Sequence, residues 1–147
     1  MKVVAKNRRA KFDYDVLETV EAGIILTGQE VKSCRLGHVD LAGAYVSLWR
    51  GSAVLRNAKI QPYRFASNLE EYDPAHDRTL LLKKRERTKL ESFSEQQGVT
   101  VIPLEVRAGR YIKVLLAVAR GRKTFDKRRK IREKEITRRL RRGEEVS

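Results

Sequence analysis

The sequence Val99–Val118, VTVIPLEVRAGRYIKVLLAV, decides the fold class of this chain. Two runs rich in apolar and β-branched residues, 99–106 and 111–118, lie on either side of Arg107-Ala108-Gly109-Arg110. Two such runs joined by a short segment that contains Gly predict a β-hairpin. We therefore expect the folded part of the chain to be built from antiparallel strands.

Apolar and polar residues also form strand-like runs earlier in the chain, which predicts further strands. These runs are 12–16, 22–26, 41–50 and 53–63. A turn is expected at Gly51-Ser52. Closing such short strands into a barrel removes exposed sheet edges, so a small closed or nearly closed barrel is the economical arrangement.

Two segments are expected to be helical. In Gly28–Gly37, Val31 and Cys34 fall at helical spacing, and Gly37 is placed to cap the C-terminal end. The segment 80–97 combines a Leu cluster with good helix formers, and Gly98 ends it. Between these helices, 64–77 lacks periodicity and predicts a mobile loop.

The chain is strongly basic, with 33 Lys or Arg against 19 Asp or Glu and a net charge of +14 over 147 residues. Thirteen Lys or Arg and five Asp or Glu lie in Arg120–Ser147, so this last fifth of the chain carries +8. The part before Arg120 is also basic. We expect one domain with a tail, and an anionic partner that contacts both, with nucleic acid as the first choice and an anionic membrane surface as the second.

Cysteine usage and hydropathy indicate where the protein works. The single cysteine, Cys34, cannot form an internal disulfide and fits a reducing compartment. The N-terminus has no apolar run of a secretory signal, and no stretch approaches the roughly 20 apolar residues of a membrane span. The expected location is the cytoplasm.

The tail combines charge with a single aromatic residue. Gly121 follows the last predicted strand and is expected to act as a hinge, and Phe125 lies among cations, where it could stack on a base. No Pro or Gly occurs between Asp126 and Gly143. A helix there would be polar nearly all round, so it is expected to form on a partner and not by itself.

Residue types that often support catalysis are scattered. Glu21 and Glu30 are the carboxylates considered, and Glu30 has no companion carboxylate in its segment, so an ordinary surface position is expected. His76 has no second His or Cys at ligand spacing, so no metal site and no cofactor are expected. Cys34 is expected to be a small buried apolar residue.

Basic and aromatic residues of the body have two interpretations each. Arg8, Arg9 and Lys113 either extend a binding surface or are ordinary surface charges. Four aromatic residues on predicted strands either stack on bases or fill the core, and core filling is expected for at least half of them. They are Tyr45, Trp49, Tyr63 and Tyr111.

Several motifs, taken in order, resemble a known family. The segment Gly28–Arg35 (GQEVKSCR) is followed by Asn57-x-x-Ile60-x-Pro62-Tyr63, then by Asp73-Pro74 with Leu80-Leu81-Leu82, then by Gly121-x-Lys123-x-x-Asp126-Lys127-Arg128. Together they resemble the small protein B family, the SsrA (tmRNA)-binding proteins of bacterial trans-translation. The similarity extends from about Asn7 to Ile136.

The resemblance implies a fold and a function. The fold is mainly β with flanking helices, a small OB-type β-barrel (residues 1–120) plus a basic C-terminal tail (121–147) that is disordered when free and helical on the ribosome. The body holds the tRNA-like domain of tmRNA. The tail occupies the empty mRNA channel and decoding site of the small subunit of a stalled ribosome, so that the nascent peptide is tagged for proteolysis. The protein would not be an enzyme, and elongation factor Tu and alanyl-tRNA synthetase would act beside it.

The resemblance also implies site residues. The expected tmRNA-binding residues are Asn7, Arg8, Arg9, Glu21, Lys32, Arg35, Leu81 and Lys113. The expected ribosomal residues of the tail are Gly121, Lys123, Phe125, Asp126, Lys127, Arg128 and Ile131. Phe125 replaces a His of relatives, which retains stacking but not a hydrogen bond.

Other classes of function remain open on the residues alone. A structural ribosomal protein also combines a small β body with a basic tail. A nuclease or RNA-modifying enzyme would need Glu21, Glu30 or His76. A membrane-surface helix is disfavoured because the tail has a thin apolar face.

Overall fold

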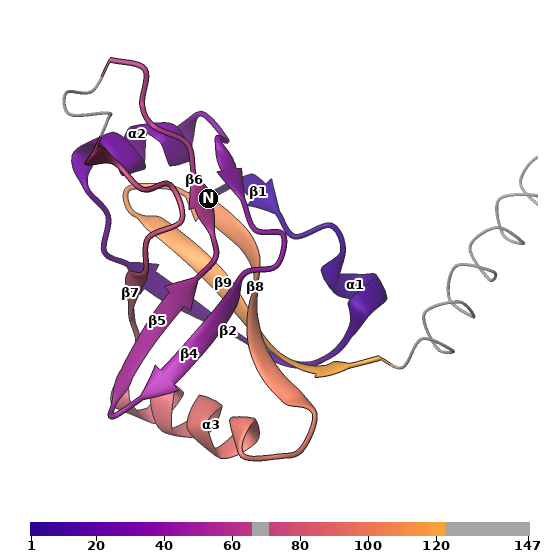
Figure 1. Ribbon diagram of the computed structural model, residues 1–147. Helices are drawn as coiled ribbons and strands as arrows, with labels where there is room; N and C mark the ends of the chain where they lie inside the picture. Colours follow the sequence, from indigo (N-terminus) through magenta and orange to yellow (C-terminus); the bar gives the residue numbers. More distant parts are fainter. Residues whose placement is uncertain (66–70, 123–147) are drawn as a thin grey trace, which may run out of the picture.

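The computed structural model describes residues 1–65 and 71–122 (Figure 1). The strands are β1 (Lys2–Lys6), β2 (Tyr14–Ile24), β3 (Val39–Asp40), β4 (Tyr45–Trp49), β5 (Ser52–Arg56), β6 (Lys59–Ile60), β7 (Arg78–Leu81), β8 (Val99–Ala108) and β9 (Ile112–Gly121). The helices are α1 (Ala10–Asp13), α2 (Gly28–Arg35) and α3 (Lys84–Ser94). The predictions for Lys123, Phe125, Asp126, Lys127, Arg128 and Ile131 lie outside the described residues.

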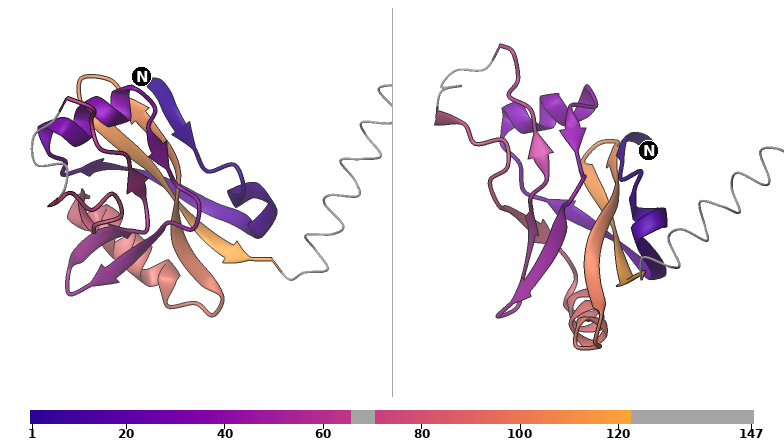
Figure 2. Two further views of the ribbon diagram at one scale, coloured as in Figure 1. Left: turned by 45° about the horizontal axis from the view of Figure 1, so that its top comes forward. Right: turned by 45° about the vertical axis from the view of Figure 1, so that its right-hand side comes forward.

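The strands form a closed barrel. They are hydrogen-bonded in the order β8-β4-β5-β7-β2-β9, and β9 pairs again with β8 to complete the ring. β4 pairs with β8 at Val101, and β1 pairs with β8 farther along, at 105–108. β3 and β6 form a separate two-stranded sheet. The helices lie outside the barrel (Figures 1 and 2). The prediction of a small, mainly β barrel with flanking helices is confirmed.

The hairpin predicted in Val99–Val118 is present as β8 and β9. Its strands pair from Val99↔Arg120 to Ala108↔Ile112, with a register shift between Pro103 and Glu105. Both strands are longer than predicted, so the turn is shorter. Gly121 is the last residue of β9 and pairs with Tyr14, so it closes the strand and does not follow it.

β2 differs from the prediction of two strands at 12–16 and 22–26. It is a single strand that pairs with β9 from Tyr14↔Gly121 to Gly23↔Lys113, with a bulge between Val16 and Glu18. Because β9 offers a continuous edge along nearly the whole of β2, the polar residues between the two apolar runs are held in the same ladder. Phe12 lies in α1 and not in a strand.

Local sequence signals place both ends of α2. The side chain of Thr27 accepts from the backbone N–H of Glu30, and the Glu30 carboxylate accepts from the backbone N–H of Thr27, which is a capping box. At the other end Gly37 adopts a φ of 80°, and its N–H donates to the Cys34 carbonyl, while His38 donates to Ser33. The predicted helix and its glycine cap are confirmed.

The helix predicted from Leu80 is wrong over its first residues. Arg78–Leu81 form β7, in which Arg78 and Leu80 are buried and Leu81 points outward. Pairing with β5 on one edge and β2 on the other fixes these residues in a strand, which overrides the helical propensity of the Leu cluster. The helix α3 starts at Lys84, after a cap in which Lys83 donates its backbone N–H to Glu86.

A buried ion pair joins α2 to β7. Arg78 and Glu30 are each 1% exposed, and the Arg78 Nε lies 2.8 Å from Glu30 Oε2. The Arg78 guanidinium also donates to the carbonyls of Ala58 and Pro74, at 2.8 Å each. His76 Nε2 lies 2.8 Å from the same Glu30 oxygen. The expectation of an ordinary surface Glu30 is therefore wrong.

The same network orders part of the segment predicted as a mobile loop. The Tyr72 hydroxyl donates to the Ile60 carbonyl at 2.8 Å, and Arg78 holds the Pro74 carbonyl. Residues 66–70 of that segment lie outside the described residues. Burial alone would raise the pKa of Glu30, but the hydrogen bond from Thr27 and the interactions with Arg78 and His76 lower it below its usual 4.5.

Replacing Arg78 by Met is expected to lower the free energy of unfolding by about 3–5 kcal/mol, because it leaves the buried Glu30 carboxylate without its partner. Urea unfolding measures this loss. The control is Arg56→Met, which removes an exposed pair with Asp77 at 3.9 Å and should cost less than about 1 kcal/mol.

Equal losses in the two variants would contradict the assignment. Acid provides a second readout of the same pair. The contribution of Glu30 is complete above its unfolded pKa of 4.5 and is lost as the pH falls through the lower pKa of the folded state. A Glu30→Gln variant should lack this acid-dependent loss.

Candidate nucleic-acid interface

The wall of the barrel made by β7, β2, β9, β8 and β1 brings distant residues into one row. Leu81 pairs with Gly23, Gly23 with Lys113, Lys113 with Arg107, and Arg107 with Val3. Directly opposite residues of neighbouring strands point to the same side of a sheet. Since Val114 and Val106 in the next position are buried, this row points outward.

A second outward row lies beside the first. Glu21 pairs with Leu115, and Leu115 pairs with Glu105. We call the two rows the outer β face, made of Val3, Glu21, Leu81, Glu105, Arg107, Lys113 and Leu115. The structure thus brings together three residues predicted to bind RNA from three strands, namely Glu21, Leu81 and Lys113.

Charges on the outer β face are arranged around Arg107. Its Nε donates to Glu105 at 3.0 Å and its Nη1 donates to Glu21 at 3.1 Å. The hydrogen bond to Glu105, and then that to Glu21, raise the pKa of Arg107 above its usual value. Glu21 therefore positions an arginine, which is one of the roles that a carboxylate on an RNA-binding surface can have.

Leu81 and Lys113 give this surface its apolar and cationic contacts. Leu81 is 56% exposed, and Lys113 is half-buried with no ion pair in the part of the chain that the structure describes. Gly23 lies between them, and a Cβ atom there would come within 3.2 Å of the Leu81 Cβ. A side chain at Gly23 would therefore crowd Leu81 on the outer β face.

The β8–β9 turn extends this face toward α2. Arg35 donates from Nη1 to the Gly109 carbonyl at 2.9 Å and from Nη2 to the Arg110 carbonyl at 3.2 Å. The adjoining Tyr111 ring is 63% exposed, and the Arg110 guanidinium lies 5.6 Å from its centre. Arg35, predicted as an RNA contact, therefore also holds the turn in place.

The predicted N-terminal contacts lie farther along the same wall. Asn7 donates from its side chain to the Pro103 carbonyl at 3.0 Å, and its backbone N–H donates to the Leu104 carbonyl. Arg8 and Arg9 are exposed, although Arg9 lies 3.8 Å from Asp13. α1 covers Ala119, which is six residues from Lys113 and so about 20 Å away along β9.

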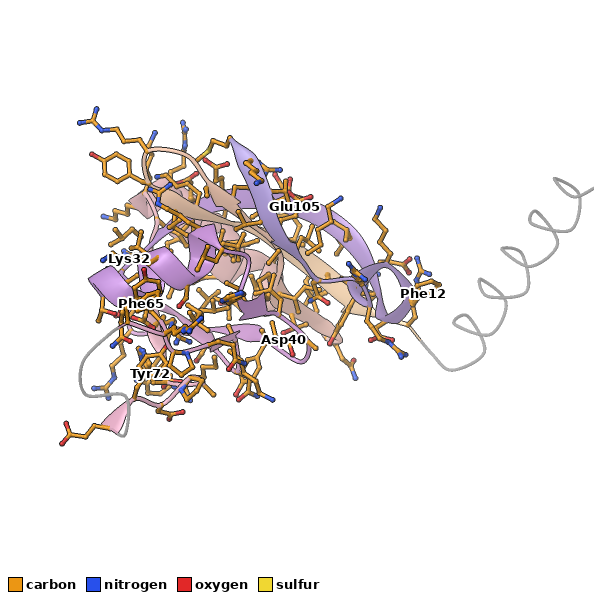
Figure 3. The ribbon with its side chains drawn as sticks, turned by 90° about the horizontal axis from the view of Figure 1, so that it is seen from above. Phe12, Lys32, Asp40, Phe65, Tyr72 and Glu105 are labelled. Atoms are coloured by element: carbon orange, nitrogen blue, oxygen red, sulfur yellow. The ribbon has the colours of Figure 1, made fainter. Side chains whose placement is uncertain are left out.

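Lys32 is not part of the outer β face. Its Nζ lies 5.2 Å from the centre of the Tyr63 ring, on the side of α2 that faces the loop after β6. Figure 3 shows Lys32 with Phe65 and Tyr72 on one side of the molecule and Glu105 on another. The structure separates Lys32 from the other predicted contacts, although Lys32 and Arg35 share a short helix.

The carboxylates considered for catalysis have structural partners. Glu30 is buried against Arg78, and Glu21 pairs with Arg107. Burial raises the pKa of the Cys34 thiol to about 11, as expected of an inert buried cysteine. Within residues 1–65 and 71–122, no His, Cys, Asp and Glu side chains group as metal ligands, and no helix there could span a bilayer.

Two arginines with structural roles were not predicted from the sequence, and more strand aromatics are exposed than expected. Arg78 and Arg107 were not singled out, because their partners are distant in sequence. Core filling was expected for at least half of four strand aromatics, but three of them, Tyr45, Trp49 and Tyr111, are 40%, 68% and 63% exposed. The alternation along β4 contained the signal, because Tyr45 and Trp49 are in phase opposite to the buried Val46.

A closed β-barrel with a mixed charged and apolar outer wall, in a chain of net charge +14 with a basic tail, is typical of the class of small nucleic-acid-binding barrel proteins. The family model described as SmpB protein matches residues 4–145. The chain belongs to the SmpB family.

Relatives support the assignment over nearly the whole chain. An SsrA-binding protein of Coprothermobacter proteolyticus is 47% identical over 97% of this chain and 96% of its own length. One from a Synechococcus species is 46% identical over 97% of this chain and 93% of its own. A chain of the solved structure called "tmRNA-SmpB: a journey to the center of the bacterial ribosome" is 45% identical, with a TM-score of 0.68 over 81% of this chain and 84% of that one.

Substituting Arg35 by Met should loosen the β8–β9 turn, because two hydrogen bonds to its carbonyls are lost. Hydrogen exchange at Gly109–Tyr111 is expected to speed up, with a stability loss of about 1 kcal/mol. Lys32→Met, on the same helix but far from the turn, is the matched control and should leave that exchange unchanged. Unaltered exchange in Arg35→Met would show that the β8–β9 turn is stable without the two hydrogen bonds from Arg35.

Proposed function

We propose that this protein is the tmRNA (SsrA RNA)-binding adaptor of trans-translation. Membership of the SmpB family and relatives named SsrA-binding proteins over nearly the full length support this function. The body binds the tRNA-like domain of tmRNA and delivers it to stalled ribosomes. The nascent peptide is then tagged for proteolysis and the ribosome is released.

The observation that carries the proposal is the convergence of Glu21, Leu81 and Lys113 on the outer β face. The face is mixed, with Leu81 as an apolar contact, Lys113 as a cation and Glu21 holding Arg107. A mixed surface of this kind suits a folded RNA, which is recognised by shape and by its backbone more than by base sequence. Arg35 and the exposed Tyr111 extend the contact at the β8–β9 turn.

The tail was predicted as 121–147, but Gly121 pairs with Tyr14 and Arg122 donates to the Asp13 carbonyl, so the part proposed to read the ribosome is 123–147. Disordered when free, it becomes helical in an empty mRNA channel, where Lys and Arg contact phosphates and Phe125 stacks on a base of the decoding site. Asp126, Lys127 and Arg128 form the signalling motif, with Lys123 and Ile131 on either side. A channel that still holds mRNA excludes this helix, so the tail acts as a steric check.

We further propose that the protein acts in the cytoplasm without catalysis of its own, since Glu21 and Glu30, the two carboxylates considered for catalysis, are engaged with Arg107 and Arg78. Elongation factor Tu and alanyl-tRNA synthetase act on the same tmRNA. In this proposal both proteins contact tmRNA, and their association with this protein is indirect.

Lys113→Ala is expected to weaken binding of the isolated tRNA-like domain about tenfold, because it removes a cation from the outer β face. Glu21→Ala should weaken it less, by freeing Arg107 from its position. Filter binding at two salt concentrations measures both, and Lys59→Ala on β6 is the control. Affinity within twofold of wild type in both variants would show that Glu21 and Lys113 do not contribute to RNA binding.

Truncation after Arg122 is expected to leave affinity for the tRNA-like domain largely intact and to abolish tagging. Arg122 is the appropriate end, because its backbone N–H donates to the Asp13 carbonyl at 2.9 Å and its guanidinium pairs with Asp15 at 2.6 Å. In-vitro tagging on ribosomes stalled without a codon, beside filter binding, gives both readouts. Loss of most of the RNA affinity in the truncated protein would contradict the division between body and tail.

A further inference from the structure

An exposed tryptophan lies at the tip of the β4–β5 hairpin, away from the outer β face. Trp49 is the single Trp of the chain and is 68% exposed. Its exposure is fixed by the strand, because Val46 points into the core and Trp49 is in the opposite phase. Because the strand directs the indole outward and no other element buries it, the indole is available to a partner.

One arginine lies against this indole, and a second lies against the adjoining turn. The Arg50 guanidinium lies 5.4 Å from the centre of the Trp49 ring. Arg50 and Gly51 form the two-residue turn with φ of 47° and 77°, and Arg50 is an unusual residue in this left-handed conformation. The turn thus contains local backbone strain at Arg50 and holds that cation beside the indole.

Arg87 of α3 supplies the second cation. A Cβ atom at Gly51 would lie 3.7 Å from the Arg87 Cζ, so the guanidinium lies directly against the turn. Its Nε pairs with Glu91 at 3.7 Å, and the Arg87 side chain is 30% exposed. The start of α3 adds exposed Lys84 and Arg85. We call Trp49, Arg50 and Arg87 the Trp49 cluster.

The chemistry of the Trp49 cluster fits an unpaired nucleobase with its phosphates. An exposed indole stacks on any base, and arginines beside it pair with phosphate oxygens and add cation–π attraction. A protein partner would need an acidic surface to neutralise these cations. A protein partner with an apolar surface would remove water from the cations without pairing them, which is unfavourable. An RNA strand satisfies both the ring and the charges.

The position of the cluster points to a second RNA, separate from the one on the outer β face. In the ring β8-β4-β5-β7-β2-β9, the pair β4–β5 stands opposite the pair β2–β9. Figures 1 and 2 show the β4–β5 turn beside α3 at one end of the barrel and the β8–β9 turn beside α2 at the other. β9 runs from the α2 end, and the chain leaves the barrel beside α1, where Arg122 donates its backbone N–H to the Asp13 carbonyl.

We propose that the Trp49 cluster binds an unpaired base of ribosomal RNA. The inference rests on the proposed function, in which the outer β face holds tmRNA and the tail enters the ribosome. The Trp49 cluster then acts as a second anchor of the body on the ribosome, which fixes the barrel while the tail probes the channel.

The test uses the full-length protein saturated with the tRNA-like domain and purified ribosomes that lack a codon in the decoding site. Trp49→Ala should lower the affinity of this complex for ribosomes about tenfold, as expected for loss of one stacked base. Trp49→Phe should retain most of it, and Arg87→Gln should lower it by a smaller factor. Phe65→Ala removes a comparable exposed aromatic, with the Arg64 guanidinium 5.4 Å from its ring centre, and is the matched control.

Two further readouts make the outcome decisive. The fluorescence of Trp49 should be quenched when the wild-type complex binds ribosomes, and a photoreactive benzophenone at position 49 should crosslink to ribosomal RNA. Ribosome affinity of Trp49→Ala within twofold of wild type would overturn the proposal, as would crosslinks to a ribosomal protein or to tmRNA. Failure of the wild-type protein to bind the tRNA-like domain would instead contradict the proposed function, and the two failures are thereby distinguished.

Discussion

β9 is hydrogen-bonded along both of its edges, to β2 and to β8, and the rest of the molecule depends on that constraint. The two ladders close the barrel and fix the phase of every residue in the strand. Val114, Leu116 and Val118 point into the core, so Lys113 and Leu115 must point outward. A slip of one residue would move Lys113 into the core and remove the cation from the outer β face.

The buried Glu30–Arg78 pair performs a comparable task at the α2 end. It joins α2 to β7 and, through the carbonyls of Ala58 and Pro74, to the segment between β6 and β7. Arg35 on the same helix then reaches the β8–β9 turn. The buried ion pair thereby orients α2, and through Arg35 it helps to position the β8–β9 turn at the edge of the outer β face.

The barrel carries different chemistry at its two ends. The outer β face and the β8–β9 turn lie toward α2, whereas the β4–β5 turn with Trp49 and the start of α3 lie at the opposite end. An adaptor that joins one RNA to another needs such a separation, because a single contiguous surface would make the two ligands compete. A closed barrel provides it, since its opposite walls face in opposite directions.

The sequence by itself determined the mainly β class, the β8–β9 hairpin, the α2 helix with its glycine cap, the strong positive charge and the family resemblance, because these depend on local periodicity, turn chemistry and collinear motifs. It did not reveal that Leu80 lies in a strand, that Glu30 is buried against Arg78, or that Tyr45, Trp49 and Tyr111 are exposed. Those features depend on which strands become neighbours and in which register, over separations such as the 48 residues between Glu30 and Arg78. Only the tertiary structure decides pairing at that range, because the burial that selects it exists only once the barrel has closed.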